Sequence, residues 1–232
     1  MRIWDVSPGY LNRQSLLGEH RELHGIVSII RNNKKGYSKH PETLRWVGHG
    51  WALKQRHKLI VAEMNLRGYI DRSPVTLRSK KYLWPPVFID SPASQLSILS
   101  KKYEMREPGR IPLPQNAQQL WAQHKYSAMA RNITAYKDIG KWVTSKHGLK
   151  AMHDVALELA TLLKTPPNPK LIRNSVLHMW GYVSEYSETT KEYIDSIPTK
   201  KVLKKIQHLA LSNNSRYLID STALSELCAW TD

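Results

Sequence analysis

The stretch that decides the fold of this chain runs from Leu16 to His24 and reads LLGEHRELH. Apolar residues recur along it and just beyond it at the spacing of one helix face: Leu16, Leu23, Val27 and Ile30. Such a stripe is typical of an α-helix that buries one side against a core. The sequence therefore predicts a core helix here, and Glu22 lies at the edge of its buried stripe.

Two glycines flank Glu22 on the predicted helix. Gly18 lies four residues before it and Gly25 three residues after it, so all three share one strip of the helix surface. Each glycine costs about 1 kcal/mol of helix stability relative to alanine. Small residues beside a carboxylate leave room for a ligand to approach it. The alternative interpretation is a solvated helix face with incidental glycines.

Several motifs share their spacing with a known family. They are Met1-Arg2-Ile3, Leu11, Gln14, Glu19-His20-Arg21-Glu22-Leu23, Gly48-His49 and the segment 62–69, AEMNLRGY. Residues 1–70 thereby resemble the pyrimidine-dimer DNA glycosylase/AP lyase family of phage and bacteria. The helical spacing of the apolar residues predicts an all-α fold here, a three-helix domain with an N-terminal arm. The resemblance implies catalysis by the α-amine of Met1 and by Glu22, and DNA contacts from Arg2, Gln14 and Arg21. His49, in the shared Gly48-His49 motif, is a further candidate for a nucleic-acid contact.

The chemistry of this family suits an N-terminal amine. An unperturbed α-amine has a pKa of about 7.7–8.0, against about 10.4 for lysine, so more of it is neutral near pH 7.5. The neutral amine attacks C1′, displaces the base and leaves an imine, after which β-elimination breaks the strand. The phage enzyme uses the amine of a threonine exposed by loss of methionine. Here Arg2 is large, so we expect Met1 to be retained.

The chain is strongly basic. Its 232 residues carry a formal charge of +16 and 41% are hydrophobic, enough for a substantial core. Residues 1–116 hold 20 Lys/Arg and 9 Asp/Glu, a net charge of +11, and residues 117–232 have a net charge of +5. This excess predicts a polyanionic partner or an anionic surface. The alternative interpretation is a charge that serves solubility alone.

Residues 70–92 mix cations, aromatic rings and prolines. The residues that we expect to contact nucleic acid here are Arg78, Lys80, Lys81, Tyr82 and Trp84. Cations can follow a phosphate backbone while a ring meets an unstacked base. An ordinary interdomain loop is the alternative. A single helix is expected before this segment, over residues 42–67, and another after it, over 93–104.

A Pro/Gly-rich stretch, residues 105–116, predicts a linker between a glycosylase-like domain, 1–104, and a second small helical bundle, 117–232. Helices are expected near 116–131, 134–146, 149–164, 169–185, 199–211 and 220–230. Residues 117–211 resemble a poorly characterised helical domain that also occurs attached to bacterial thiouracil/thiouridine desulfidases, where RNA binding is implied. The candidate nucleic-acid contacts are His124, Lys125 and Arg173.

The predicted function is a DNA repair N-glycosylase/AP lyase that acts on UV-induced pyrimidine dimers in double-stranded DNA. The alternative is an RNA-binding protein, with transfer RNA as a candidate partner, or an RNA-processing enzyme. No cofactor and no metal site are expected: one cysteine excludes a cysteine zinc cluster, and His124 and His178 lack a third ligand. We also expect a cytoplasmic protein without a membrane span.

Overall fold

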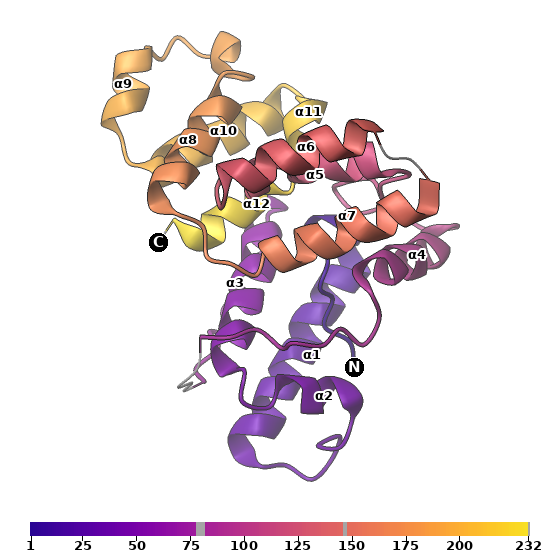
Figure 1. Cartoon of the computed structure of the whole chain (residues 1–232). Coiled ribbons are helices and arrows are strands. Elements are labelled where there is room, and N and C mark those ends of the chain that lie inside the picture. The colour runs from indigo at the N-terminus through magenta and orange to yellow at the C-terminus, as the bar shows by residue number, and fades with distance from the viewer. Residues whose placement is uncertain (78–81, 146–147, 232) are drawn as a thin grey trace. The chain divides into compact units, whose positions relative to one another are not determined.

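The computed structural model describes residues 1–77, 82–145 and 148–231, which form helices and loops without a β-strand. The predicted all-α fold is confirmed. The chain divides into two compact units, Met1–Gly109 and Arg110–Asp232 (Figure 1). That the first unit is catalytic and the second accessory stays a prediction. In the described part of the chain, no helix combines the length and the apolar character that a membrane span needs.

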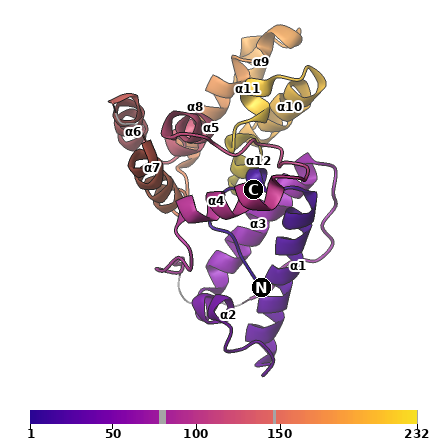
Figure 2. The ribbon, with the colours of Figure 1, turned by 90° about the vertical axis from the view of Figure 1, so that its right-hand side faces the viewer.

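The first unit is built on two long helices that lie side by side, α1 and α3 (Figure 2). Its elements are η1 (Pro8–Tyr10), α1 (Arg13–Asn32), α2 (Pro41–Trp46), α3 (Gly50–Leu66) and α4 (Pro92–Tyr103). The Asn12 side chain caps α1 by accepting a hydrogen bond from the Ser15 N–H at 2.9 Å. Leu16, Leu23 and Val27 are buried as the sequence predicts, whereas Ile30 is only half-buried.

The single helix expected over residues 42–67 is two helices, α2 and α3. Between them Val47 has an extended backbone and Gly48 has a φ of +81°, a backbone conformation that residues with a Cβ rarely adopt. His49 then starts α3. The periodicity of apolar residues continues across this break, so it did not reveal the turn. The three longer helices, α1, α3 and α4, are those that the sequence predicts.

Helix α4 and the residues after it hold the beginning of the chain. The Tyr103 hydroxyl accepts a hydrogen bond from the buried Asn12 N–H at 3.0 Å. The Asn12 side chain donates to the Glu107 carbonyl at 3.3 Å. Gly109 packs so closely that a Cβ there would lie 2.4 Å from the Tyr10 carbonyl oxygen. Only glycine allows this approach, which fixes the base of the N-terminal arm.

The second unit surrounds helix α5, which packs against α6, α7, α8 and α12. Its elements are α5 (Ala117–Met129), α6 (Ile133–Ser145), α7 (Gly148–Leu162), α8 (Pro169–Trp180), η2 (Ser184–Tyr186), α9 (Lys191–Ser196), α10 (Thr199–Ser212), α11 (Arg216–Ile219), α12 (Ala223–Glu226) and η3 (Leu227–Trp230). Helix α9 was not expected, and the segment near 220–230 is a series of short turns. A buried ion pair, Arg131 Nη2 to Glu226 Oε1 at 2.6 Å, joins these turns to the rest.

Candidate active site

The N-terminal arm lies along α1 and is held by two carboxylates of that helix. The Arg2 N–H donates a hydrogen bond to Oε2 of Glu22, and the Trp4 N–H donates to Oε1 of Glu19 at 3.1 Å. Arg2 and Trp4 lie two residues apart on the extended arm, so their N–H groups point the same way. Glu22 and Glu19 lie three residues apart, on one face of α1, and therefore meet these two N–H groups. The first peptide bond of the chain therefore lies against the Glu22 carboxylate.

Beneath this contact is a buried ion pair between Glu19 and Arg56 of α3. The guanidinium donates to both carboxylate oxygens, Nε to Oε1 at 2.7 Å and Nη2 to Oε2 at 2.8 Å. Its Nη1 also donates to the Val6 carbonyl at 2.9 Å. Burial raises the pKa of the Glu19 carboxyl group, and the Arg56 cation opposes that rise. The pair thus fixes the arm to α1 and α3 at once.

Helices α2 and α4 hold the other side of the arm. Arg45 donates from Nη1 to Asp5 at 2.7 Å and from Nη2 to the Ile3 carbonyl at 3.1 Å. Gln95 exchanges two hydrogen bonds with Asp5, accepting from its N–H at 2.7 Å and donating to its carboxylate at 2.9 Å. Four helices therefore position the first six residues, and the amino terminus has a defined place beside Glu22.

Glu22 is half-buried and opens onto free space. A Cβ built at Gly18 or at Gly25 would meet no atom within 4 Å. The strip of α1 on both sides of the carboxylate is thus uncovered, as the glycine spacing predicts. A bulky group of a ligand can reach the carboxylate and the amino terminus from this side.

Three polar candidates from the sequence lie on the N-terminal arm and on α1. Arg2 pairs with Asp90 at 2.7 Å, and its guanidinium lies 4.8 Å from the ring centroid of Trp4. Arg21 is exposed, with Nε donating to the Leu17 carbonyl at 3.3 Å. Gln14 is exposed in the first turn of α1. Their contacts with DNA stay predictions.

A second group of candidates gathers at the start of α3. The centroid of the Trp51 ring lies 6.2 Å from that of Trp84 and 5.8 Å from that of Tyr82. Tyr82 is 74% exposed. His49 Nδ1 lies 2.9 Å from the Leu83 carbonyl oxygen. Three further candidates lie outside the described residues: Arg78, Lys80 and Lys81.

The candidates in the second unit differ in accessibility. His124 is buried, its Nδ1 lies 2.9 Å from the Leu120 carbonyl oxygen, and burial lowers its pKa to about 4. Arg173 is half-buried and donates to backbone carbonyls at the end of α9, including that of Ile194 at 2.6 Å. Lys125 donates a hydrogen bond to the Tyr217 hydroxyl. Their part in nucleic-acid binding stays a prediction.

The residues that position the arm were not among the sequence candidates: Glu19, Arg45, Arg56, Asp90 and Gln95. One signal was available: Glu19 lies three residues before Glu22 on the same predicted helix. Arg56 lies within the polar run 54–58, KQRHK, where nothing marks it as buried. Only the fold shows that it pairs with Glu19.

Comparisons with known proteins assign each part of the chain to a family model. Residues 1–77 match the family described as pyrimidine dimer DNA glycosylase, and residues 125–227 match the family described as protein of unknown function (DUF1722). No curated protein and no solved structure gives a significant match. Both resemblances predicted from the sequence are thereby confirmed. The first part of the chain is thus similar to the pyrimidine dimer DNA glycosylases. Most of the second part is similar to a family whose function is unknown.

Proposed function

We propose that this protein is a DNA N-glycosylase/AP lyase whose nucleophile is the α-amine of Met1 and whose second catalytic group is Glu22. The observation that carries the proposal is the hydrogen bond from the Arg2 N–H to the Glu22 carboxylate. Only the Cα and carbonyl carbon of Met1 separate that N–H from the amine. The amine and the carboxylate therefore belong to one site, and the match of residues 1–77 to the pyrimidine dimer DNA glycosylases supports glycosylase chemistry there.

The proposed reaction proceeds in two steps. The neutral amine attacks C1′ of the damaged nucleotide, the C1′–N bond breaks, and the base leaves with the electron pair and takes up a proton. The C1′–O4′ bond then breaks, O4′ takes up the second amine proton, and an imine links Met1 to the opened sugar. Removal of a C2′ proton then expels the 3′ phosphate and breaks the strand by β-elimination.

Glu22 is suited to both steps. Its charge stabilises the cationic sugar that develops as the base leaves, and its oxygens can accept or return protons beside C1′ and C2′. The open strip at Gly18 and Gly25 leaves space for a nucleotide turned out of the duplex. Turning a nucleotide out of the duplex costs a few kcal/mol. The cost is lower at a lesion, so damaged sites are favoured.

The proposed substrate is double-stranded DNA that contains UV-induced pyrimidine dimers. The family match supports the lesion class, and the net charge of +16 supports a polyanionic partner. Exposed Arg21 directly precedes Glu22 on α1, and the N–H of half-buried Arg2 donates to the Glu22 carboxylate. We assign them to phosphates on either side of the lesion.

The test is borohydride trapping on dimer-containing DNA, in three forms of the protein. Untagged protein and protein with a C-terminal tag should both give the covalent complex, because both have a free Met1 amine. An N-terminal extension of the same length should abolish trapping. Equal trapping by the N-terminally extended form would place the nucleophile elsewhere.

A second experiment addresses Glu22. Glu22→Gln keeps an oxygen that can accept the Arg2 N–H but removes the charge. We expect it to bind damaged DNA within about two-fold of wild type and to lose at least about 100-fold in base release, the scale of general acid–base catalysis. The matched control is Glu104→Gln, at an exposed position of the same unit, which should retain full activity. Full activity of Glu22→Gln would refute its role.

RNA binding by the second unit is the alternative function, and one observation favours it. The rings of Tyr182 and Tyr217 stack at 4.2 Å, and both residues are more than 40% exposed. The Lys125 ammonium lies 4.7 Å from the Tyr217 ring centroid. Exposed rings beside a cation are typical of sites that stack unpaired bases.

Tyr217→Leu tests this alternative, because it removes the aromatic face but keeps an apolar side chain. Loss of one base stack should weaken single-stranded RNA binding by about five-fold or more. Tyr193→Leu, at a tyrosine that is 54% exposed in the same unit, is the control. Unchanged RNA affinity in the Tyr217 variant would argue against a stacking role.

A further inference from the structure

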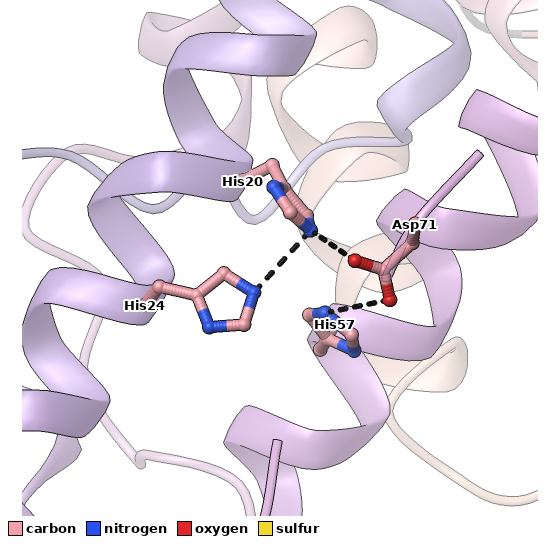
Figure 3. Close-up of side chains that lie close together, drawn as sticks. All are labelled: His20, His24, His57 and Asp71. Atoms are coloured by element: carbon pink, nitrogen blue, oxygen red, sulfur yellow. Dashed lines mark hydrogen bonds and ion pairs between the residues drawn. The ribbon is translucent and has the colours of Figure 1, made fainter. Parts of the chain in front are cut away.

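Three histidines and an aspartate converge in the first unit, apart from the proposed catalytic pair. His20 and His24 lie one turn apart on α1, His57 projects from α3, and Asp71 follows the end of α3 (Figure 3). One ligand atom from each side chain can be chosen so that all four lie within 4.8 Å of one another. Three segments of the chain thus meet at one cluster, the His₃Asp cluster.

The spacing inside the His₃Asp cluster fits a metal ion. His20 Nε2 lies 3.1 Å from Asp71 Oδ1 and 3.3 Å from His24 Nε2, and His57 Nε2 lies 3.6 Å from Asp71 Oδ2. Zinc bound tetrahedrally at about 2.0–2.1 Å from each ligand requires ligand atoms about 3.4 Å apart. The chosen ligand atoms of the remaining pairs lie within 4.8 Å of one another.

Hydrogen bonding alone does not satisfy the cluster. If His20 Nε2 carries a proton, that single N–H has to be shared between Asp71 and His24 Nε2. The Nε2 atom of His57 is buried and has no hydrogen-bond partner among the described residues, and the residue as a whole is only 5% exposed. A cation at the centre accepts the lone pairs of all three imidazoles and the carboxylate at once.

We propose that His20, His24, His57 and Asp71 form a binding site for a divalent transition metal, with Zn²⁺ as the preferred ion. Three imidazoles and one carboxylate match the ligand chemistry of zinc. Because four protein ligands complete a tetrahedral shell, the ion has no open position for a substrate. The site is therefore structural and links α1, α3 and the segment that carries Asp71.

The geometry of α1 separates this site from the proposed catalytic carboxylate. His20 and His24 each lie two residues from Glu22, which places them about 200° around the helix axis from it. The metal thus binds on the opposite side of α1 and stabilises the helix that presents Glu22. The proposal does not depend on the glycosylase assignment.

The experiment measures zinc directly in untagged protein, because a histidine tag would bind the ion itself. After loading with Zn²⁺ and dialysis, wild type should retain one zinc per chain by atomic spectroscopy and melt at a higher temperature than the metal-free form. Asp71→Asn and His24→Gln should weaken zinc binding at least ten-fold and remove the thermal shift. His178→Gln, an exposed histidine in the second unit, should behave as wild type.

A spectroscopic readout keeps the test decisive if a variant folds poorly. Co²⁺ substituted into wild type should show the intense visible absorption of tetrahedral coordination. Absence of retained zinc in wild type, a weak octahedral cobalt spectrum, or unchanged zinc affinity in folded Asp71→Asn and His24→Gln would each overturn the proposal.

Discussion

Arg56→Met tests how the arm is held beside Glu22. The substitution removes three hydrogen bonds: two to the carboxylate of Glu19 and one to the Val6 carbonyl. Glu19 is 2% exposed and would retain only the Trp4 N–H as a donor among these contacts. Removing one partner of a buried ion pair costs about 3–5 kcal/mol, because the other charge is left without compensation.

This cost is large for the first unit. A loss of 1 kcal/mol shifts the melting temperature of a domain of 60–100 residues by about 4–8 °C, so we expect a decrease of about 15 °C or more. Urea denaturation, followed by tryptophan fluorescence, measures the free energy of unfolding. Arg106→Met, at an exposed arginine of the same unit, is the control and should change stability by less than about 0.5 kcal/mol.

A double variant identifies the cause. Glu19→Gln combined with Arg56→Met keeps an acceptor for the Trp4 N–H and removes both charges. It should recover at least about half of the stability lost in Arg56→Met, because no uncompensated charge remains buried. A stability loss below about 1 kcal/mol in Arg56→Met, or no recovery in the double variant, would show that an uncompensated charge on Glu19 is not the cause.

Three further predictions concern single positions of the first unit. Gly18→Ala should raise stability by about 1 kcal/mol, because the added methyl group meets open space and alanine favours a helix; a loss on urea unfolding would contradict this. Gly109→Ala should cost about 1–3 kcal/mol, because its methyl group would lie 2.4 Å from the Tyr10 carbonyl; unchanged unfolding would show that the backbone adapts freely. Arg21→Glu should weaken DNA binding and reduce the slope of log K against log salt concentration by about 1, measured in binding titrations at several salt concentrations. An unchanged slope would show that Arg21 does not contact the DNA.

The sequence predicted much of this fold because its signals are local. The stripe Leu16, Leu23 and Val27 defined α1, and the Pro/Gly-rich residues 105–116 indicated a change of unit near the observed boundary at Gly109. The turn at Gly48 escaped prediction, because apolar residues continue through it. Helix α9 escaped because it has only six residues, too few for a period to show.

The site was only partly predictable, because several of its contacts join residues that lie far apart in the sequence. The placement of Glu22 between two open glycines follows from spacing along one helix. The pairing of Arg56 with Glu19 joins residues 37 positions apart, and no local pattern specifies it. The His₃Asp cluster is similar: His20 and His24 have the spacing of two ligands on one helix face, but His57 and Asp71 join them only through the packing of α3 on α1.

The most direct test of the central claim is to identify the atom that forms the imine. Untagged protein is trapped with borohydride on dimer-containing DNA, digested, and mapped by tandem mass spectrometry. The proposed mechanism predicts that the reduced sugar adduct lies on the α-nitrogen of Met1, in the N-terminal peptide. An adduct on a lysine side chain, with Met1 unmodified, would contradict it.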